Sequence, residues 1–408
     1  MYHSTLLFLF LAPLTPLAEA RPAACAAKGA KATNGKAVYL ITNDQANAVV
    51  ALPIGQDGLL KGAATSTPTG GAGANGIDGS TNQTAAPDAL FSQSSLTIAG
   101  MNLFAVNAGS NTLSMFTINP LDPTDLTMVG QPIDIPGEFP TTVAASMKSK
   151  LACVGSTGAI AGVSCAPFST QGLGAMDGLR VFNLGQTTPP VGPTNTVSQV
   201  FFSDDGSTLF STVKGDPTKN NTGFLAAFPV EASSSPSAGA AAAVVSQQGT
   251  MTSPAGTAVL FGASTIPASN DLFVTDASFG GAVLSLDNKD VATVKGKGIV
   301  DGQKATCWVA ISPATNTAFV TDVGTNRLVE MSLADATIQS QTDLSANGDP
   351  GLIDLRAAGN FIYALSPGNG TTQAAVTVVD ALSKKQVQHL QLQGSAVDKN
   401  AQGMALLE

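Results

Sequence analysis

The stretch LFAVNAGSNTLSMFTI, residues 103–118, contains two segments in which apolar residues alternate with small or polar ones, separated by an Asn/Gly/Ser cluster. Alternation with a period of two is typical of a half-buried β-strand, and the cluster between the segments is typical of a tight turn. The same outline returns without a gap in AFVTDVGTNRLVEMSL, residues 318–333. One hairpin explains one copy, whereas copies spaced tens of residues apart indicate a repeat architecture.

Seven segments share this outline when they are aligned on the central residue of the first strand. These residues are Leu40, Phe104, Ala152, Phe210, Phe273, Phe319 and Tyr363, at intervals of 44 to 64 residues. Another alternating segment precedes most copies, and a weaker strand follows the hairpin. Four strands in each repeat of this length are typical of a β-propeller, in which each sheet packs between two neighbours. We therefore predict an all-β fold, a seven-bladed β-propeller.

The two ends of the repeat region complement each other. The first copy has only a polar tail before it, and the chain ends with an isolated strand-like segment, NAQGMALLE. We predict that residues 403–407 form the innermost strand of the first blade and close the ring, because closure removes two exposed sheet edges. The predicted organisation is a signal peptide (1–20), an N-terminal tail (21–36) and a single propeller domain (37–408). The low-complexity segments 61–87 and 231–245 are expected to be mobile surface loops.

The first twenty residues, MYHSTLLFLFLAPLTPLAEA, combine a short apolar core with an Ala-Glu-Ala end, as a secretory signal does. This core is too short to span a bilayer and no later segment has a comparable apolar run, so no membrane span is predicted. We expect a protein that is secreted, extracellular or cell-wall-associated, and monomeric. The net charge of −9 argues against nucleic acid as a partner, because a polyanion would be repelled.

The cysteines and the glycosylation motifs fit an exported chain. Four cysteines allow three pairings when all of them form disulfides. Cys153 and Cys165 close the shortest loop, so we predict that they pair with each other, which leaves Cys25 for Cys307 by elimination. Sequons that predict glycosylation occur at Asn82, Asn220 and Asn369.

Two of the hairpins, residues 39–54 (YLITNDQANAVVALPI) and 103–118, resemble the YVTN-type hairpin of seven-bladed lactonase-like propellers. The run VFNLGQTTPPVGPTNTVSQVFFSDDGSTLFSTVKGDP, residues 181–217, is similar to exported fungal proteins catalogued as carboxymuconate cyclase-like. The general likeness covers nearly all of residues 37–408. It implies a seven-bladed ring, an extracellular or wall-associated glycoprotein and, in some members, lactone-forming or lactone-opening chemistry.

The cyclase chemistry of that family does not carry over to this sequence. The characterised cyclases employ a histidine together with arginines that grip a polycarboxylate. Beyond the predicted signal, this chain has one histidine, His389, in a segment expected to be an outer strand of the last blade. An acidic protein would also repel a polycarboxylate over most of its surface. The resemblance therefore implies ancestry more than activity.

The best catalytic candidates are Lys214 and Asp216 in the segment TVKGDP, together with Glu138. They fall in connections expected on one face of the propeller, where the loops are long and binding usually resides. There a lysine would stabilise a lactone oxyanion while a carboxylate positions water. The alternative is structural, because Gly-Asp-Pro favours a turn by backbone geometry alone.

No cofactor and no metal site is predicted. The sequence lacks a GxSxG elbow, an HExxH motif and an EF-hand loop, and GAGANG (residues 71–76) matches GxGxxG only inside a linker. Four residues occupy equivalent places after strands and are interpreted as Asx-turn formers, with a ring of calcium ligands as the alternative. They are Asn43, Asn107, Asp276 and Asp322.

Two functions from different classes remain open. We expect mainly a glycosylated extracellular or cell-surface binding protein, such as an adhesin, antigen or effector, whose partner is an extracellular or host surface component. The alternative is a lactonase or cyclase that acts on a small lactone or muconate-type substrate through Lys214 and acidic neighbours. Enzymatic activity stays undecided at this point, because no matching catalytic histidine is present.

Overall fold

The computed structural model describes residues 1, 34–232 and 243–408. The predicted signal peptide, apart from Met1, and most of the predicted N-terminal tail, including Cys25, lie outside the described residues. Ala32–Glu408 forms one compact unit. Its described residues contain strands, turns and two short 3-10 helices, η1 (Pro217–Lys219) and η2 (Ser345–Asn347), but no α-helix. No helix in the described part of the chain has the length and apolar character that crossing a membrane requires.

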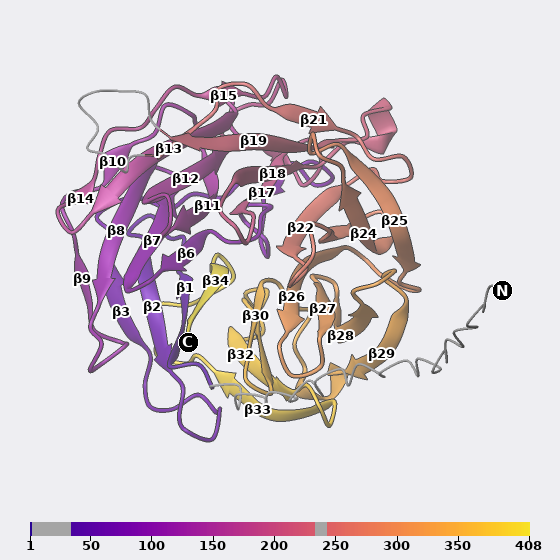
Figure 1. Ribbon diagram of the computed structural model, residues 1–408. Helices are drawn as coiled ribbons and strands as arrows, with labels where there is room; N and C mark the ends of the chain where they lie inside the picture. Colours follow the sequence, from indigo (N-terminus) through magenta and orange to yellow (C-terminus); the bar gives the residue numbers. More distant parts are fainter. Residues whose placement is uncertain (2–33, 233–242) are drawn as a thin grey trace. The chain divides into compact units, whose positions relative to one another are not determined.

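Seven antiparallel sheets of four or five strands follow one another along the chain (Figure 1). The first contains β34 (Gln402–Leu407), β1 (Ala37–Ile41), β2 (Ala48–Pro53) and β3 (Thr65–Pro68). The second contains β6 (Leu96–Ala99), β7 (Asn102–Asn107), β8 (Thr112–Ile118), β9 (Leu126–Met128) and β10 (Ile133–Asp134). The third contains β11 (Pro140–Ser146), β12 (Leu151–Ser156), β13 (Gly162–Ser169), β14 (Gly172–Leu173) and β15 (Arg180–Val181).

The remaining sheets repeat this order. The fourth contains β17 (Val197–Phe202), β18 (Thr208–Val213), β19 (Phe224–Ala232), β20 (Ala243–Val245) and β21 (Thr250–Thr252). The fifth contains β22 (Leu260–Thr265), β23 (Leu272–Asp276), β24 (Gly280–Leu286) and β25 (Ala292–Ile299). The sixth contains β26 (Thr306–Ser312), β27 (Thr317–Asp322), β28 (Thr325–Ser332) and β29 (Ile338–Asp343). The seventh contains β30 (Leu355–Ala358), β31 (Phe361–Ser366), β32 (Ala375–Asp380) and β33 (Lys385–Gln391).

The first strand of each sheet, here called its inner strand, contacts the inner strands of both neighbouring sheets. The inner strands are β34, β6, β11, β17, β22, β26 and β30, and the succession of contacts returns from β30 to β34. The C-terminal strand β34 pairs antiparallel with β1, with Val38 opposite Leu406 and Tyr39 opposite Ala405. The first sheet therefore joins strands from both ends of the described chain.

The hydrophobic core lies between neighbouring sheets. Each of the seven aligned residues of the sequence repeat, from Leu40 to Tyr363, lies on the second strand of its sheet and is at most 2% exposed. These strands are buried on both faces, so large side chains such as Phe104 and Phe273 pack against the next sheet. Burying such a side chain contributes about 1.5–3 kcal/mol, which explains why the repeat is carried by apolar residues rather than by turn residues.

The segment 61–87 corrects one prediction, because it is not a loop without structure. It contributes the outer strand β3 to the first sheet and two short strands, β4 (Ile77–Asp78) and β5 (Gln83–Thr84). These two strands form a small separate sheet with β16 (Val191–Gly192). Low complexity misled the prediction, because small residues here allow close backbone packing: a Cβ on Gly73 would lie 2.3 Å from the backbone of Asn43. Of the second predicted loop, residues 233–242 lie outside the described residues.

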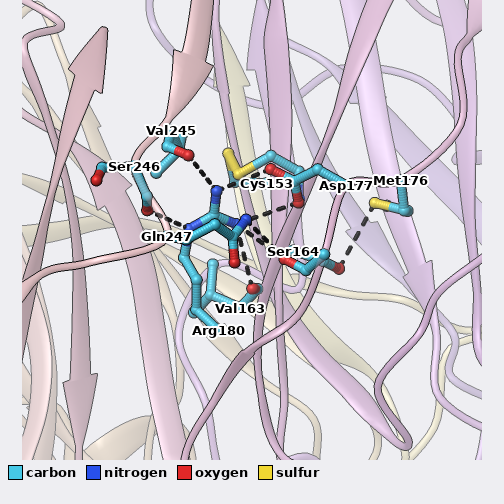
Figure 2. Close-up of a disulfide and its surroundings, with 11 residues drawn as sticks. Cys153, Val163, Ser164, Met176, Asp177, Arg180, Val245, Ser246 and Gln247 are labelled. Carbon is cyan, nitrogen blue, oxygen red and sulfur yellow. Dashed lines mark hydrogen bonds and ion pairs between the residues drawn. A yellow bond between two sulfur atoms is a disulfide. The ribbon is translucent and has the colours of Figure 1, made fainter.

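The predicted disulfide between Cys153 and Cys165 is confirmed and joins β12 to β13. Figure 2 shows that the guanidinium of Arg180 lies beside this bridge, between the third and fourth sheets. It forms an ion pair with Asp177 at 2.8 Å and donates hydrogen bonds to the carbonyl oxygens of Ser246, at 2.7 Å, and Val245. Asp177 in turn accepts from the backbone N–H of Cys165 at 2.7 Å. Arg180 thus fastens the disulfide hairpin to the neighbouring sheet.

Candidate functional site

Residues 88–95, here called the inner segment, run from the small separate sheet to β6 and bond to the inner strands of several sheets. The N–H of Gln93 donates to Ser198 O at 2.9 Å, and the indole N–H of Trp308 donates to Ser92 O at 3.0 Å. The N–H of Ser94 donates to the buried carboxylate of Asp354 at 2.9 Å. The inner segment is therefore held by the fourth, sixth and seventh sheets.

A cavity of about 460 Å³ lies next to the inner segment. This volume is in the range of ordinary small-molecule sites. Its walls come from the inner segment, from the end of β18, and from the connections that precede β17, β22 and β26. Its most buried lining residues, here called the deep wall, are all at most 7% exposed: Ala85, Asp88, Phe91, Lys214, Val259, Phe261 and Cys307.

Lys214 reaches this cavity because of the local backbone path after β18. Its N–H donates to Thr196 O at 2.9 Å, and the following residue is Gly215, where a Cβ would lie 2.2 Å from Asn221 O. The ammonium donates to the carbonyl oxygen of Phe91 and lies 4.1 Å from the centroid of the Phe261 ring. Lys214 is 1% exposed and forms no salt bridge with any residue of the described ranges.

Asp88 is the other buried charged residue on the wall of this cavity, and its charge interacts with that of Lys214. Burial raises the pKa of Asp88 to about 7, although the positive charge of Lys214 opposes the change. Burial likewise lowers the pKa of Lys214 to about 8, opposed by the negative charge of Asp88. The Oδ1 atom of Asp88 is buried and has no hydrogen-bond partner among the described residues. A buried polar atom without a partner is costly, so this oxygen would gain from a hydrogen-bond donor brought into the space beside it.

The backbone of the inner segment is strained where it presents these groups. Asp88, Phe91 and Ser94 have φ values of +64°, +56° and +65°, which non-glycine residues rarely adopt. Such conformations persist where the surrounding structure imposes them, and they gather at functional sites. Here two of the three residues, Asp88 and Phe91, line the cavity, and the Phe91 carbonyl accepts from Lys214.

Cys307 lies on the wall of the cavity as a buried thiol that is not bonded to any cysteine of the described residues. Burial raises the pKa of this thiol well above its usual value, so it is not a nucleophilic thiolate. The predicted bond from Cys307 to Cys25 stays a prediction, because Cys25 lies outside the described residues.

The structure does not bring the three predicted catalytic residues together. Asp216 caps the short helix η1, where its Oδ1 accepts from the N–H of Thr218 at 3.1 Å, and it also pairs with Lys219 at 3.2 Å. Glu138 is half-buried between β10 and β11 and accepts from the hydroxyl of Thr188. Neither residue lines the cavity of Lys214. The turn interpretation therefore holds for Asp216, and only Lys214 of the three reaches the cavity.

Of the four predicted Asx-turn formers, the two asparagines bond elsewhere: the side-chain amide of Asn43 donates to Ala74 O and that of Asn107 donates to the Ser114 hydroxyl, both at 2.9 Å. The two aspartates do act in turns. Oδ1 of Asp276 accepts from the N–H of Ser278 at 3.0 Å, and Oδ1 of Asp322 accepts from the N–H of Gly324 at 2.8 Å, as in Asx turns. His389 lies on the outer strand β33, 3.1 Å from a carboxylate oxygen of Asp349. Within residues 34–232 and 243–408, no group of three or more His, Cys, Asp or Glu side chains is arranged to hold a metal ion. The sequon residues are all exposed, at Asn82, Asn220 and Asn369.

Asp88 was missed at the level of sequence because it stands in a low-complexity region. The available signal is its neighbourhood: Leu90 and Phe91 are adjacent large apolar residues in a stretch otherwise dominated by small and polar ones. Such a pair inside a polar linker indicates a segment that enters the core. No periodicity, however, connects this segment to Lys214.

No protein-family model and no curated protein sequence matches this chain. Among solved structures, the chain is similar to a periplasmic gluconolactonase of Pseudomonas aeruginosa, with a TM-score of 0.60 and 14% identity over 91% of this chain and 99% of that one. It is also similar to a protein from Lactobacillus plantarum, with a TM-score of 0.51 and 14% identity over 69% of this chain and 79% of that one. At this level of identity the likeness concerns the fold alone, a β-propeller.

Proposed function

We propose that this protein is a lactonase that opens a small lactone in the cavity between Lys214 and Asp88. The observation that carries the proposal is the pair itself: a buried ammonium without a salt-bridge partner in the described chain lines the same cavity as a buried carboxyl whose Oδ1 has no hydrogen-bond partner there. Perturbed acid and base groups that share a cavity are typical of active sites.

The chemistry follows from the protonation states of the pair. Between pH 7 and pH 8 the form with an ionised Asp88 and a protonated Lys214 is most populated, given pKa values of about 7 and about 8. Asp88 accepts a proton from water as the water oxygen attacks the lactone carbonyl carbon, and Lys214 stabilises the oxyanion that forms. The ester C–O bond then breaks, and Asp88 returns its proton to the leaving alkoxide.

Lys214 has the donors that this role requires. An ammonium has three N–H groups, and the carbonyl oxygen of Phe91 accepts from it. The Phe261 ring supports the positive charge from one side, 4.1 Å from the nitrogen. Donors therefore remain for a lactone carbonyl oxygen, in a low-dielectric setting where a charge interaction is strong.

The likeness to a solved gluconolactonase supports the alternative expected from the sequence, a lactonase, more than a role limited to binding. Our proposal also includes the finer features of the fold and of the export prediction. The seven sheets are seven blades, and the pairing of β34 with β1 closes the ring. The chain is a secreted glycoprotein with Asn82, Asn220 and Asn369 as its acceptor sites. Sequence resemblance alone supports a fungal cyclase-like ancestry.

Hydrolysis assays on the purified protein test this function. We expect turnover of at least one neutral lactone, and its loss in both Lys214→Met and Asp88→Asn. Lys219→Met is the matched control, because Lys219 is an exposed lysine that pairs with Asp216 outside the cavity. Failure to hydrolyse any of a panel of five-, six- and seven-membered lactones would overturn the proposal and favour the binding protein.

A further inference from the structure

The polar residues that line the cavity differ in burial and in whether they already form hydrogen bonds within the protein. Four polar lining residues are half-buried or exposed: Asp78, Thr194, Ser278 and Lys304. Two of these are already engaged, since Oδ1 of Asp78 accepts from Ser80 at 2.7 Å and the Ser278 hydroxyl donates to Asp276 at 2.5 Å. The charged groups that are at least nine-tenths buried on this cavity wall are Lys214 and Asp88.

The rest of the deep wall is apolar. Phe91, Val259 and Phe261 are at most 7% exposed and offer side chains without strong hydrogen-bonding groups. The remaining residues of the deep wall are Ala85 and Cys307, and the Cys307 thiol is a weak donor. A ligand bound there meets one cation, one carboxyl and an apolar surface.

This distribution discriminates between classes of lactone. A sugar lactone carries several hydroxyls, and each hydroxyl that is buried without a partner opposes binding. A lactone that carries carboxylates would meet two carboxyls, Asp88 and Asp78, and two lysines, Lys214 and Lys304, so the lining has no excess of positive charge to hold it. Within the described residues, no arginine lines the cavity. A neutral lactone with an aromatic or aliphatic body needs one donor for its carbonyl and buries the remainder against apolar walls.

We infer that the substrate is a neutral, predominantly apolar lactone, whose carbonyl meets Lys214 while its hydrocarbon body packs on Phe91, Val259 and Phe261. This inference rests on the proposed lactonase function and adds the substrate class to it. The inferred substrate class excludes polyhydroxylated sugar lactones as preferred substrates.

The test compares two six-membered lactones of opposite character, dihydrocoumarin and glucono-δ-lactone, with the spontaneous hydrolysis of each subtracted. We expect kcat/KM for dihydrocoumarin to exceed that for glucono-δ-lactone by about tenfold or more, because unpaired buried hydroxyls are costly. Equal or better turnover of glucono-δ-lactone would overturn the inference and leave the lactonase function intact.

A nearly isosteric variant sharpens the test. Val259→Thr adds one hydroxyl to the deep wall, so the preference for dihydrocoumarin is expected to fall by about fivefold. Val387→Thr on the exposed face of β33 is the matched control and is expected to leave the ratio unchanged. An unchanged ratio in Val259→Thr would contradict the assignment of this wall to the substrate body.

Binding of the same two lactones, measured by calorimetry, separates failure of the lactonase function from failure of the inferred substrate class. If neither lactone is hydrolysed, the lactonase function fails, whereas binding still reports on the cavity. Dihydrocoumarin that binds about tenfold more tightly than glucono-δ-lactone, with the difference lost in Val259→Thr, supports the apolar assignment. Equal binding of both, or no binding of dihydrocoumarin, overturns it.

Discussion

Arg180 and Lys214 are both buried cations, yet their surroundings differ in kind. Arg180 has a carboxylate at 2.8 Å and carbonyl oxygens of the fourth sheet around it (Figure 2). Lys214 has one carbonyl oxygen, an aromatic ring at 4.1 Å, and a cavity of about 460 Å³ beside it. The charge of Arg180 is neutralised by the Asp177 carboxylate, whereas the Lys214 ammonium retains N–H donors for a ligand.

The contrast separates a structural from a functional use of buried charge. A buried ion pair that is broken on one side is strongly destabilising, because the remaining charge is left uncompensated. A buried lysine without such a pair adds little to stability, since its desolvation is costly. We therefore expect changes at Arg180 to affect stability, and changes at Lys214 to affect catalysis.

The largest effect is expected for Lys214→Met. Loss of the oxyanion donor should reduce kcat/KM for lactone hydrolysis about 10³-fold. The free energy of unfolding should decrease by no more than about 1 kcal/mol, because methionine fills the same space without a charge to desolvate. Steady-state kinetics and chemical denaturation measure the two quantities. If Lys214→Met lost as much stability as an Arg180 variant, Lys214 would have a structural role like that of Arg180, and the proposed contrast would be wrong.

Arg180→Met is expected to show the reverse pattern. The free energy of unfolding should fall by about 3 kcal/mol, because Asp177 and two carbonyl groups lose their donor. Since Asp177 is 33% exposed on its side chain, solvent compensates for part of the loss. Activity per folded molecule should stay within about twofold of the wild type. Greatly reduced activity in a fully folded variant would contradict this assignment.

Asp88→Asn tests the other half of the pair. Removal of the general base should reduce kcat/KM about 10²-fold while the amide keeps the shape of the side chain. Asp216→Asn is the matched control, because Asp216 caps η1 and does not line the cavity. If Asp216→Asn lost activity and Asp88→Asn kept it, the assignment of the general base to Asp88 would be contradicted.

Removal of the disulfide should cost less stability than Arg180→Met and leave catalysis unaffected. The double variant Cys153→Ala and Cys165→Ala is expected to lower the free energy of unfolding by about 2 kcal/mol, because the bridge closes a short loop between paired strands. Kinetics should remain unchanged, since the bridge lies beside Arg180 and not at the cavity. Thermal unfolding under non-reducing conditions measures the loss, and an unchanged melting temperature would contradict it.

Much of the fold could be predicted because its signals are local. Alternation along a strand reports directly on burial, so the hairpins around Phe104 and Phe319 and the second-strand position of both residues follow from a few neighbouring letters. The pairing of the C-terminal strand with β1 could be predicted for a related reason. The first repeat lacks a strand before its hairpin, and the last residues of the sequence form a strand-like segment without a hairpin.

The candidate site could be predicted only in part. Lys214 could be predicted because it directly follows a recognisable strand, but its partner Asp88 comes from a segment with no periodic pattern. Their proximity depends on how the inner segment is held by Ser198, Trp308 and Asp354, contacts between residues far apart in the chain. Asp216 was a plausible neighbour in sequence, yet its side chain is used by the turn that begins at Pro217.

The pH dependence of kcat/KM for a neutral lactone tests the Lys214 and Asp88 pair most directly. Activity requires an ionised Asp88 and a protonated Lys214, so it should rise with pH through about 7 and fall through about 8. The rising limb should disappear in Asp88→Asn and the falling limb in Lys214→Met, within the residual rates of these variants. A profile with the same two limbs in both variants would contradict the assignment of acid and base to this pair.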